Sequence, residues 1–281
     1  MIIALFPHEK KKHSFEVAHQ IREFLFQKGI EVVAEDDKAG DLRAKPLSQV
    51  NSKDIAFLIA MGGDGTLLRI AHHFSHLNAP ILGINLGHLG FMADVPADDV
   101  ISSLSDLLEG AYKVNERLML EAVGPDGKIL LAVNDLVFHR ANNYSLIELS
   151  IHFDNVYVNT FLADGVVVAT PNGSTAYSLA AGGPILTPNL DAIVLTPICP
   201  HTISNRPLVV SADHHIEIEY LSPYDPIDVR SDGVDAFPLP SRKKVTIRRS
   251  SQTFKLVNLF RHEYFSTLRT KLGWSGKLTN S

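Results

Sequence analysis

The feature that most constrains this chain is an apolar run that ends in a glycine turn. Residues 55–61 (Ile-Ala-Phe-Leu-Ile-Ala-Met) are apolar throughout, as in a strand covered on both faces. Directly behind them the chain reads Gly-Gly-Asp-Gly-Thr over residues 62–66, and residues 66–77 have a helical pattern. Glycines let backbone amides approach an anion, and the N-terminus of a helix favours negative charge. The sequence therefore predicts a strand–turn–helix unit that binds phosphate.

One acidic side chain, Asp64, stands in the middle of this turn, where a carboxylate repels phosphate. Such a carboxylate has a use in phosphate chemistry if it accepts a proton from a hydroxyl group or holds Mg²⁺ between phosphates. Both roles belong to phosphoryl transfer, and the chain has no Gly-x-x-x-x-Gly-Lys-Ser/Thr motif of the P-loop type. The alternative is that Asp64 only caps the helix that begins near Thr66. These five residues leave both interpretations open.

The first third of the chain alternates short apolar runs with helical patterns. We expect strands at residues 2–6, 30–34, 55–61 and 80–85 and helices at residues 14–28 and 66–77. Strands separated by helices favour a parallel sheet that is covered on both faces. The sequence therefore predicts an α/β domain with a doubly wound parallel sheet and helices on both faces.

After a helix expected at residues 97–109, the pattern becomes strand after strand. These strands are expected at residues 117–123, 129–139, 146–153, 155–162, 165–169, 192–196, 208–210, 215–221, 225–230, 243–249 and 254–259. Turn residues at 125–127 (Pro-Asp-Gly) and 154–155 (Asp-Asn) join neighbouring runs as hairpins would. This part is predicted to be antiparallel and rich in β structure.

We therefore expect two domains, with a boundary after residue 98. Residues 1–98 would form the α/β domain that carries the glycine turn, and residues 99–259 would form the β-rich domain. A helical pattern at residues 261–272 predicts that the C-terminal segment, residues 260–281, returns to the first domain.

Charge and composition exclude several classes of partner. The formal net charge is −5, so the chain has no basic field that would gather nucleic acid or anionic lipid. It has one cysteine, no signal-peptide pattern and no apolar run long enough to span a membrane. We expect a cytoplasmic protein without nucleic-acid or membrane partners. Adjacent histidines such as His72 and His73 point in different directions, and we predict no protein-built metal site.

A second turn, rich in glycine and hydroxyl groups, follows the apolar strand at residues 165–169. Residues 170–178 read Thr-Pro-Asn-Gly-Ser-Thr-Ala-Tyr-Ser. Their hydroxyls and amides suit the polar edges of a ribose and a base, and the Tyr177 ring offers a flat apolar face. The alternative is an ordinary surface loop.

A polar pair, Asn134 and Asp135, falls in the middle of the apolar strand expected at residues 129–138. Asn and Asp are poor strand residues, and a buried polar pair needs hydrogen-bond partners. The sugar hydroxyls of a nucleotide would serve, and so would a structural hydrogen-bond network. Both interpretations stay open.

Taken together, these segments closely resemble the NAD kinase family, in the same order along most of the chain. The resemblance is carried by residues 62–66, 85–91, 134–135, 164–177, 181–185 and 197–207. The first segment alone is also similar to diacylglycerol kinases, sphingosine kinases and phosphofructokinases, whereas the combination is specific. The family architecture, an α/β domain followed by a β-rich domain, is similar to the one that the periodicity predicts.

The resemblance implies transfer of the terminal phosphoryl group of ATP to the 2′-hydroxyl of the adenosine ribose of NAD, giving NADP. Asp64 would be the general base, and Mg²⁺ or another divalent cation would be held mainly by nucleotide phosphates. Asn134 and Asp135 match the family's Asn-Glu pair, with Asp one methylene shorter. The residues implied to bind the nucleotides are Gly62, Gly63, Gly65, Thr66, Phe91, Asn134, Asp135, Asp164, Asn172, Thr175, Ala176 and Tyr177.

Asn172 stands where the family usually has a small hydroxyl residue. The family also implies a homotetramer or a homodimer. The rival hypotheses are a lipid kinase of the diacylglycerol type, which shares the first glycine turn, and a non-catalytic sensor that binds NAD without reacting. Retention of Asp64 argues against the sensor, because a pure binder gains nothing from a base beside a hydroxyl.

Overall fold

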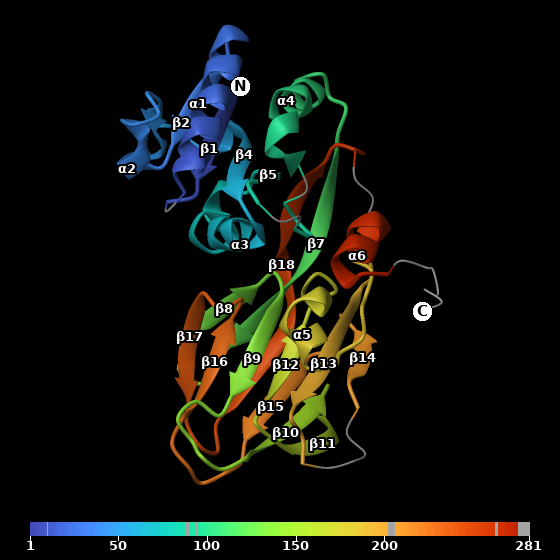
Figure 1. Cartoon of the computed structure of the whole chain (residues 1–281). Coiled ribbons are helices and arrows are strands. Elements are labelled where there is room, and N and C mark those ends of the chain that lie inside the picture. Colours follow the sequence, from blue (N-terminus) through green and yellow to red (C-terminus); the bar gives the residue numbers. More distant parts are fainter. Residues whose placement is uncertain (10, 88–89, 94, 202–205, 262–263, 275–281) are drawn as a thin grey trace, which may run out of the picture. The chain divides into compact units, whose positions relative to one another are not determined.

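The computed structural model describes residues 1–9, 11–87, 90–93, 95–201, 206–261 and 264–274 (Figure 1). Contacts divide the chain into two compact units: Met1–Glu116 together with Lys255–Ser281, and Arg117–Phe254. This division falls later in the chain than residue 98, because helix α4 (Val100–Leu108) buries Val100, Leu104 and Leu107 in the core of the first unit.

The first unit contains a parallel sheet in which the strands lie in the order β5-β4-β1-β2-β3, and β6 pairs with β5. The neighbouring strands are parallel throughout. Their bounds are β1 (Ile2–Pro7), β2 (Glu31–Ala34), β3 (Lys45–Pro46), β4 (Ile55–Gly62), β5 (Ile81–Asn85) and β6 (Val95–Pro96). Near the end of the chain, Leu256 of β18 (Lys244–Asn258) pairs with Ile81 of β5 in the parallel sense.

Helices cover both faces of this sheet. The helices of the unit are α1 (Lys12–Gln27), α2 (Asp36–Ala39), α3 (Asp64–His73), α4 and α6 (Tyr264–Leu272), with 3-10 turns at Leu47–Gln49, Ser52–Asp54, Ser75–Leu77 and Ala97–Asp99. On one face Ile3, Leu5 and Ile59 pack in a common core with side chains of α1 and α4. On the other face the Phe6 ring packs edge-on against Phe74, the residue that ends α3, at a centroid distance of 4.8 Å. The predicted doubly wound α/β architecture is confirmed.

The strand order of this sheet reverses between β1 and β4. From β1 the chain builds outward through β2 and β3, and from β4 it builds outward through β5 and β6 in the other direction. In such sheets ligands bind beyond the carboxyl ends of the two central strands, where the connecting helices diverge. The glycine turn directly follows β4, so it lies at this position.

The second unit is rich in antiparallel strands. One group contains β7 (Lys113–Val123), β8 (Ile129–Ala132), β10 (Ile147–Phe153), β11 (Val156–Ala163), β15 (Ile216–Tyr220) and β18. The other sheet has the order β14-β13-β12-β9-β16-β17. Its strands are β9 (Asp135–His139), β12 (Gly165–Ala169), β13 (Ala192–Ile198), β14 (Leu208–Ser211), β16 (Ile227–Ser231) and β17 (Asp235–Leu239). A 3-10 turn at Gly173–Thr175 and helix α5 (Tyr177–Ala180) follow β12.

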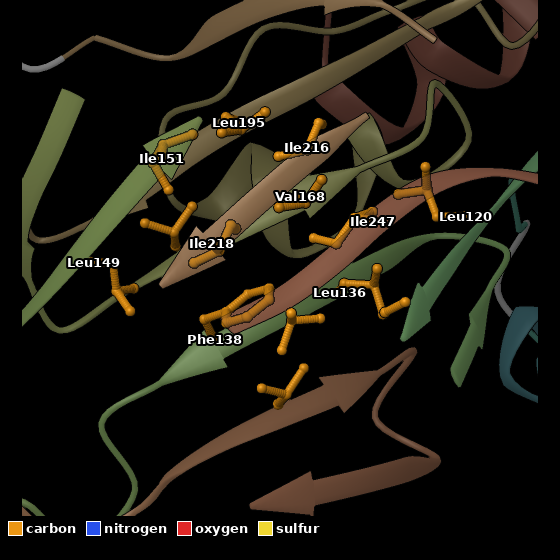
Figure 2. Close-up of a cluster of buried hydrophobic side chains, with 14 of the residues drawn as sticks. Leu120, Leu136, Phe138, Leu149, Ile151, Val168, Leu195, Ile216, Ile218 and Ile247 are labelled. Carbon is orange, nitrogen blue, oxygen red and sulfur yellow. The ribbon is translucent and has the colours of Figure 1, made fainter. Parts of the chain in front are cut away.

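The core of this unit is built from alternate residues of strands in both groups. Figure 2 shows Leu149 and Ile151 of β10 and Ile216 and Ile218 of β15 in one buried cluster with Phe138 of β9. The alternation is clear in β15, where Ile216, Ile218 and Tyr220 are fully buried. Burying one face of each strand in this way stabilises a two-layered β structure. The predicted antiparallel β-rich part is confirmed.

The structure adds two short strands to the first unit, β3 and β6, and after β7 it departs from the expected strands in three places. The single strand expected at residues 129–139 is two strands, because β8 ends at Ala132 and β9 begins at Asp135. The two strands expected at residues 243–249 and 254–259 are one continuous strand, β18. Strand β17 was not predicted, since it contains Pro238, which is tolerated because β17 lies at the edge of its sheet.

Both predicted hairpins are confirmed. β7 pairs with β8 across a turn in which Gly127 has φ +81°. β10 pairs with β11 across Asp154 and Asn155, which have φ values of +49° and +67°. No helix among the described residues has both the length and the apolar composition that crossing a membrane requires.

Candidate active site

The glycine turn links the end of β4 to the start of α3. Gly63 is the N-cap of α3, and the helix begins at Asp64. Gly62 is required by close approach, since a Cβ atom there would overlap the Thr66 hydroxyl, which is buried behind it. Gly62, Gly63 and Gly65 are not among the glycines with positive φ. Glycine is therefore needed at position 62 because a side chain would not fit there, and not because the backbone is left-handed.

The Asp64 carboxylate binds a second loop of the first unit. Its Oδ2 accepts a hydrogen bond from Phe91 N at 2.8 Å, and its Oδ1 accepts from Met92 N and Ala93 N at 3.0 Å each. Asp64 is the first residue of α3, whose N-cap is Gly63, and its carboxylate binds the amides of this loop and not those of the helix. A carboxylate has about four lone-pair positions, so three amide bonds leave room for about one further donor. A substrate hydroxyl is a donor of that kind.

Gly90 makes this arrangement possible. A Cβ atom at Gly90 would overlap Asp64 Oδ1, so only glycine lets the loop approach the carboxylate this closely. The next residue, Phe91, is half-buried; its ring lies 6.3 Å from the Tyr264 ring, and Lys271 Nζ lies 5.1 Å from its centroid. Both partners belong to α6. The C-terminal helix therefore contacts the loop that holds Asp64. The sequence predicts that this segment returns to the first domain, but not that it contacts this loop.

A pocket of about 360 Å³ lies beside the first turn of α3, lined by His8, Glu9, Gly65, Thr66 and Arg69. Its walls come from the residues that follow β1 and from α3, which follows β4, and β1 and β4 flank the reversal of strand order. The helix N-terminus and the Arg69 guanidinium favour an anion there, whereas the carboxylate of Glu9, 3.9 Å from Arg69, opposes one.

Arg69 is held in this position by Glu35, at the end of β2. The guanidinium makes two bonds to the Glu35 carboxylate, at 2.6 and 3.1 Å, and Lys38 makes another. Burial raises the pKa of Glu35, but the hydrogen bonds and charges of Arg69 and Lys38 outweigh it and hold that pKa below its usual value. This buried ionic group was also missed by the sequence analysis, because its members are 34 residues apart.

In the second unit, Asn134 lies in the break between β8 and β9, and Asp135 opens β9. The prediction that this pair lies in the middle of a strand is therefore wrong. The Asp232 carboxylate takes the place of a neighbouring strand here, since it accepts hydrogen bonds from the backbone amides of Val133, Asn134 and Asp135 at 2.8, 2.8 and 3.0 Å. Part of the polar pair thus finds its partners in a structural network.

The second glycine-rich turn joins the same cluster. Asn172 Nδ2 donates to Asn134 Oδ1 at 2.7 Å, and Thr170 N donates to the Asn134 carbonyl oxygen at 2.8 Å. A Cβ atom at Gly173 would overlap that carbonyl oxygen, so this glycine is required by close approach. Thr175 Oγ1 donates to the Asn172 carbonyl oxygen at 3.2 Å. Residues 134–135 and 170–177 therefore form one connected site.

The Asp135 carboxyl is the most perturbed acid of this site. Its residue is only 5% exposed, and burial, followed by the charge of Asp232, raises its pKa to about 7. A backbone hydrogen bond from Tyr177 acts in the opposite direction. Buried acids with a specific charged neighbour are concentrated at functional sites. Beside it, Tyr177 begins α5 and its side chain is exposed, so its ring face is accessible.

Asp164 lies apart from this cluster. It precedes β12, whereas residues 170–177 follow that strand, so about 17 Å of extended chain separates them. Its carboxylate forms an ion pair with Arg140, with 2.7 Å between Oδ1 and Nε. Within one copy of the second unit, the structure brings together Asn134, Asp135, Asn172, Thr175, Ala176 and Tyr177, but not Asp164.

Some segments that carry the family resemblance lie outside the described residues, namely His88, Leu89 and residues 202–205. In the part of the chain that the structure describes, no three His, Cys, Asp or Glu side chains come together as a metal-binding group.

Comparison with known proteins identifies both units. The ATP-NAD kinase N-terminal domain matches residues 3–112, and the ATP-NAD kinase C-terminal domain matches residues 133–259. The NAD kinase of Protochlamydia amoebophila is 54% identical over 277 residues, covering 99% of each chain. The NAD kinase of Nitrosomonas europaea is 40% identical over 266 residues, covering 92% of this chain and 90% of its own.

Solved structures agree with these sequences. A yeast NADH kinase, crystallised with NADH, has a TM-score of 0.87 and 25% identity and covers 100% of this chain and 90% of its own. An NAD kinase from Archaeoglobus fulgidus, solved with ATP, has a TM-score of 0.77 and 27% identity. The match covers 97% of this chain and 99% of that one. The fold, the glycine turn and these relatives define a two-domain phosphotransferase. Within that class, the chain belongs to the NAD kinase family.

Proposed function

We propose that this chain transfers the terminal phosphoryl group of ATP to the 2′-hydroxyl of the adenosine ribose of NAD, forming NADP and ADP. The observation that carries the proposal is the Asp64 carboxylate, which stands behind β4 at the reversal of strand order and keeps about one lone-pair position beyond its three amide bonds. The relatives supply the substrates, because the relatives by sequence are NAD kinases and the related structures hold NADH or ATP.

In this proposal Asp64 is the general base. It accepts the proton of the attacking hydroxyl as the new P–O bond forms and the bond to the leaving ADP breaks. Gly62, Gly63, Gly65 and Thr66 give the phosphates access to the start of α3, whose dipole favours their charge. Positioning of the two substrates contributes the rest, because phosphoryl transfer asks little covalent chemistry of the protein.

A divalent cation, Mg²⁺ in the first instance, fits this site as a partner of the nucleotide phosphates. The described residues offer no group of three acidic or histidine ligands, and three hydrogen bonds already occupy Asp64. The cation would therefore be held mainly by phosphate oxygens. Bound in this way, it supplies neutralisation of the charge on the transferring group.

The second unit holds the dinucleotide. Asn134 and Asp135 present oxygens to adenine and ribose, and the exposed Tyr177 ring gives a base a flat surface. Asn172, Thr175 and Ala176 line the same site. Phe91 and Asp164 are further proposed contacts of the dinucleotide.

We also propose a homotetramer or homodimer that works in the cytoplasm. The family resemblance supports the assembly, and so do exposed apolar side chains on edge strands, Val156 and Tyr157 of β11 and Val209 of β14. Light scattering of the purified protein at micromolar concentration tests the assembly, and a monomer at every concentration would contradict it.

The decisive experiment incubates the purified chain with NAD, ATP and Mg²⁺ and measures NADP with an NADP-specific dehydrogenase. Parallel incubations contain diacylglycerol in place of NAD, or excess chelator in place of Mg²⁺. We expect NADP in the first mixture only. Phosphorylated lipid would support the lipid kinase instead, and tight NAD binding without any NADP would support the sensor.

A further inference from the structure

The turn between β16 and β17 carries an aspartate, Asp232, that binds three successive backbone amides. Its Oδ2 is 2.8 Å from Val133 N, and its Oδ1 is 2.8 Å from Asn134 N and 3.0 Å from Asp135 N. In return, the Asp232 N–H donates to the Asp135 carbonyl oxygen at 3.0 Å. Bonds between backbone amides and a carboxylate are charge-assisted and stronger than neutral ones. Asp232 is therefore firmly attached to residues 133–135.

The position of these amides explains why they need a carboxylate. Residues 133 and 134 lie between two strands, where the sheet ladder is interrupted, and Val133 is fully buried. A buried amide that lacks a partner costs as much as a lost hydrogen bond. The Asp232 side chain replaces the missing ladder, and it does so at the residues whose side chains form the proposed dinucleotide site.

The turn itself does not require an aspartate. Asp232 and Gly233 have φ values of +50° and +70°, and Val234 N donates to the Ser231 carbonyl oxygen at 2.8 Å. Residues 232–234 form the turn, because Ser231 pairs with Asp235, and positive φ at two successive residues suits both Asn-Gly and Asp-Gly. An asparagine would serve the turn equally well, so the carboxylate has a purpose beyond the hairpin.

We propose that Asp232 is a positioning residue for the dinucleotide: it fixes the backbone of residues 133–135 so that the Asn134 and Asp135 side chains face the substrate ribose. This proposal rests on the function proposed above. It adds a residue that touches no substrate and acts through two residues that do.

The same carboxylate also sets the charge state of the site. Among the described residues of the second unit, Asp232 is the charged group that acts on the Asp135 carboxyl, and the Tyr177 backbone N–H of α5 faces it from the other side. Burial and the Asp232 charge raise the pKa of Asp135 to about 7. Because ribose hydroxyls donate to a carboxylate, NAD binds the ionised form, and its affinity rises between pH 6 and pH 8.

The test is Asp232→Asn, with Asp154→Asn as a matched control. Both replace an aspartate at the first left-handed position of a hairpin turn, and Asp154 also binds a backbone amide, His215 N at 3.0 Å. NAD affinity is measured by titration calorimetry from pH 6 to pH 8. At pH 8 Asp135 is ionised in the wild type and in D232N. There we expect D232N to bind NAD about tenfold more weakly or worse, because the asparagine NH2 group replaces one carboxylate oxygen and faces a backbone N–H that it cannot accept from.

A second readout separates positioning from simple loss of stability. Removal of the Asp232 charge moves the ionisation of Asp135 to lower pH, so the rise in NAD affinity between pH 6 and pH 8 flattens in D232N. The control D154N keeps both the wild-type affinity, within about twofold, and the wild-type pH profile. If D232N only destabilised the fold, its melting temperature would fall and the pH dependence of its NAD affinity would stay that of the wild type.

The proposal is overturned if D232N binds NAD at pH 8 as tightly as D154N and with the wild-type profile. Should D232N fail to fold, Asp135→Asn takes its place, because it keeps Asp232 and the turn. If the NAD affinity of D135N still rose between pH 6 and pH 8, Asp135 would not be the group whose ionisation controls NAD binding. Wild-type protein that binds NAD but forms no NADP would overturn the proposed function and leave the role of Asp232 standing.

Discussion

The buried Asp135 carboxyl should cost the protein stability at neutral pH, and this cost is measurable. An aspartate has an ordinary pKa of 3.8, and burial, followed by the Asp232 charge, raises that of Asp135 to about 7 in the folded state. The folded protein then binds a proton more tightly than the unfolded chain. Its stability is full below the unfolded pKa and falls as the pH rises through the folded pKa.

The magnitude follows from these two values. Each pH unit between them lowers the free energy of unfolding by about 1.4 kcal/mol, so the full loss is about 4 kcal/mol. Between pH 5 and pH 8 about two of those units are crossed, which corresponds to about 3 kcal/mol. Asp135→Asn removes the ionisation, and its amide oxygen can keep the bond from the Tyr177 N–H. We therefore expect the stability of D135N, relative to the wild type, to rise by about 3 kcal/mol between pH 5 and pH 8.

Urea unfolding at the two pH values measures this difference. The single tryptophan, Trp274, belongs to the first unit, so the second unit is better followed by far-ultraviolet circular dichroism. Asp228→Asn serves as the control, because Asp228 lies on β16 and pairs with the exposed Arg230. The argument from burial and charge would be refuted if the difference in unfolding free energy between D135N and the wild type changed by less than about 0.5 kcal/mol from pH 5 to pH 8.

Three further outcomes are expected in the first unit. Asp64→Asn should lower turnover at least a hundredfold with NAD affinity within a few fold, and a variant that retained more than about a tenth of the rate would exclude the general-base role. Gly90→Ala places a Cβ atom on Asp64 Oδ1 and should lower kcat at least tenfold, whereas Gly87→Ala, which meets nothing within 4 Å, should keep the wild-type rate. Glu35→Gln leaves Arg69 without its carboxylate and should cost about 3 kcal/mol of stability in thermal unfolding, a loss that an intact melting temperature would contradict.

Much of the fold was predictable because it depends on local patterns. The apolar run at β4 and the glycines behind it predict a strand and a turn from neighbouring residues alone, and the structure has both. The hairpin at Asp154 and Asn155 was predicted for the same reason, since Asn and Asp tolerate positive φ. The boundaries of β8 and β9 could not be predicted in this way. The break between them depends on Asp232, which lies 97 to 99 residues further along the chain.

The candidate site divides in the same way. Asp64 and the residue types of the second turn can be found from motifs, but their partners cannot. The amides of Phe91, Met92 and Ala93 carry no side-chain signature, so nothing local shows that they bind Asp64. For Asp232 the available signal was the pair Asp-Gly, which indicates a turn and says nothing of a distant strand.

The first unit is assembled from both ends of the chain, and this affects the order of events during synthesis. Val257 and Leu259 are buried in its core, Leu256 pairs with β5, and α6 contacts the loop that holds Asp64. A ribosome makes these residues last, after all of Arg117–Phe254. Residues 117–254 can therefore fold before the N-terminal segment has its C-terminal partners. The packing around the loop that binds Asp64 is completed only when translation is almost over.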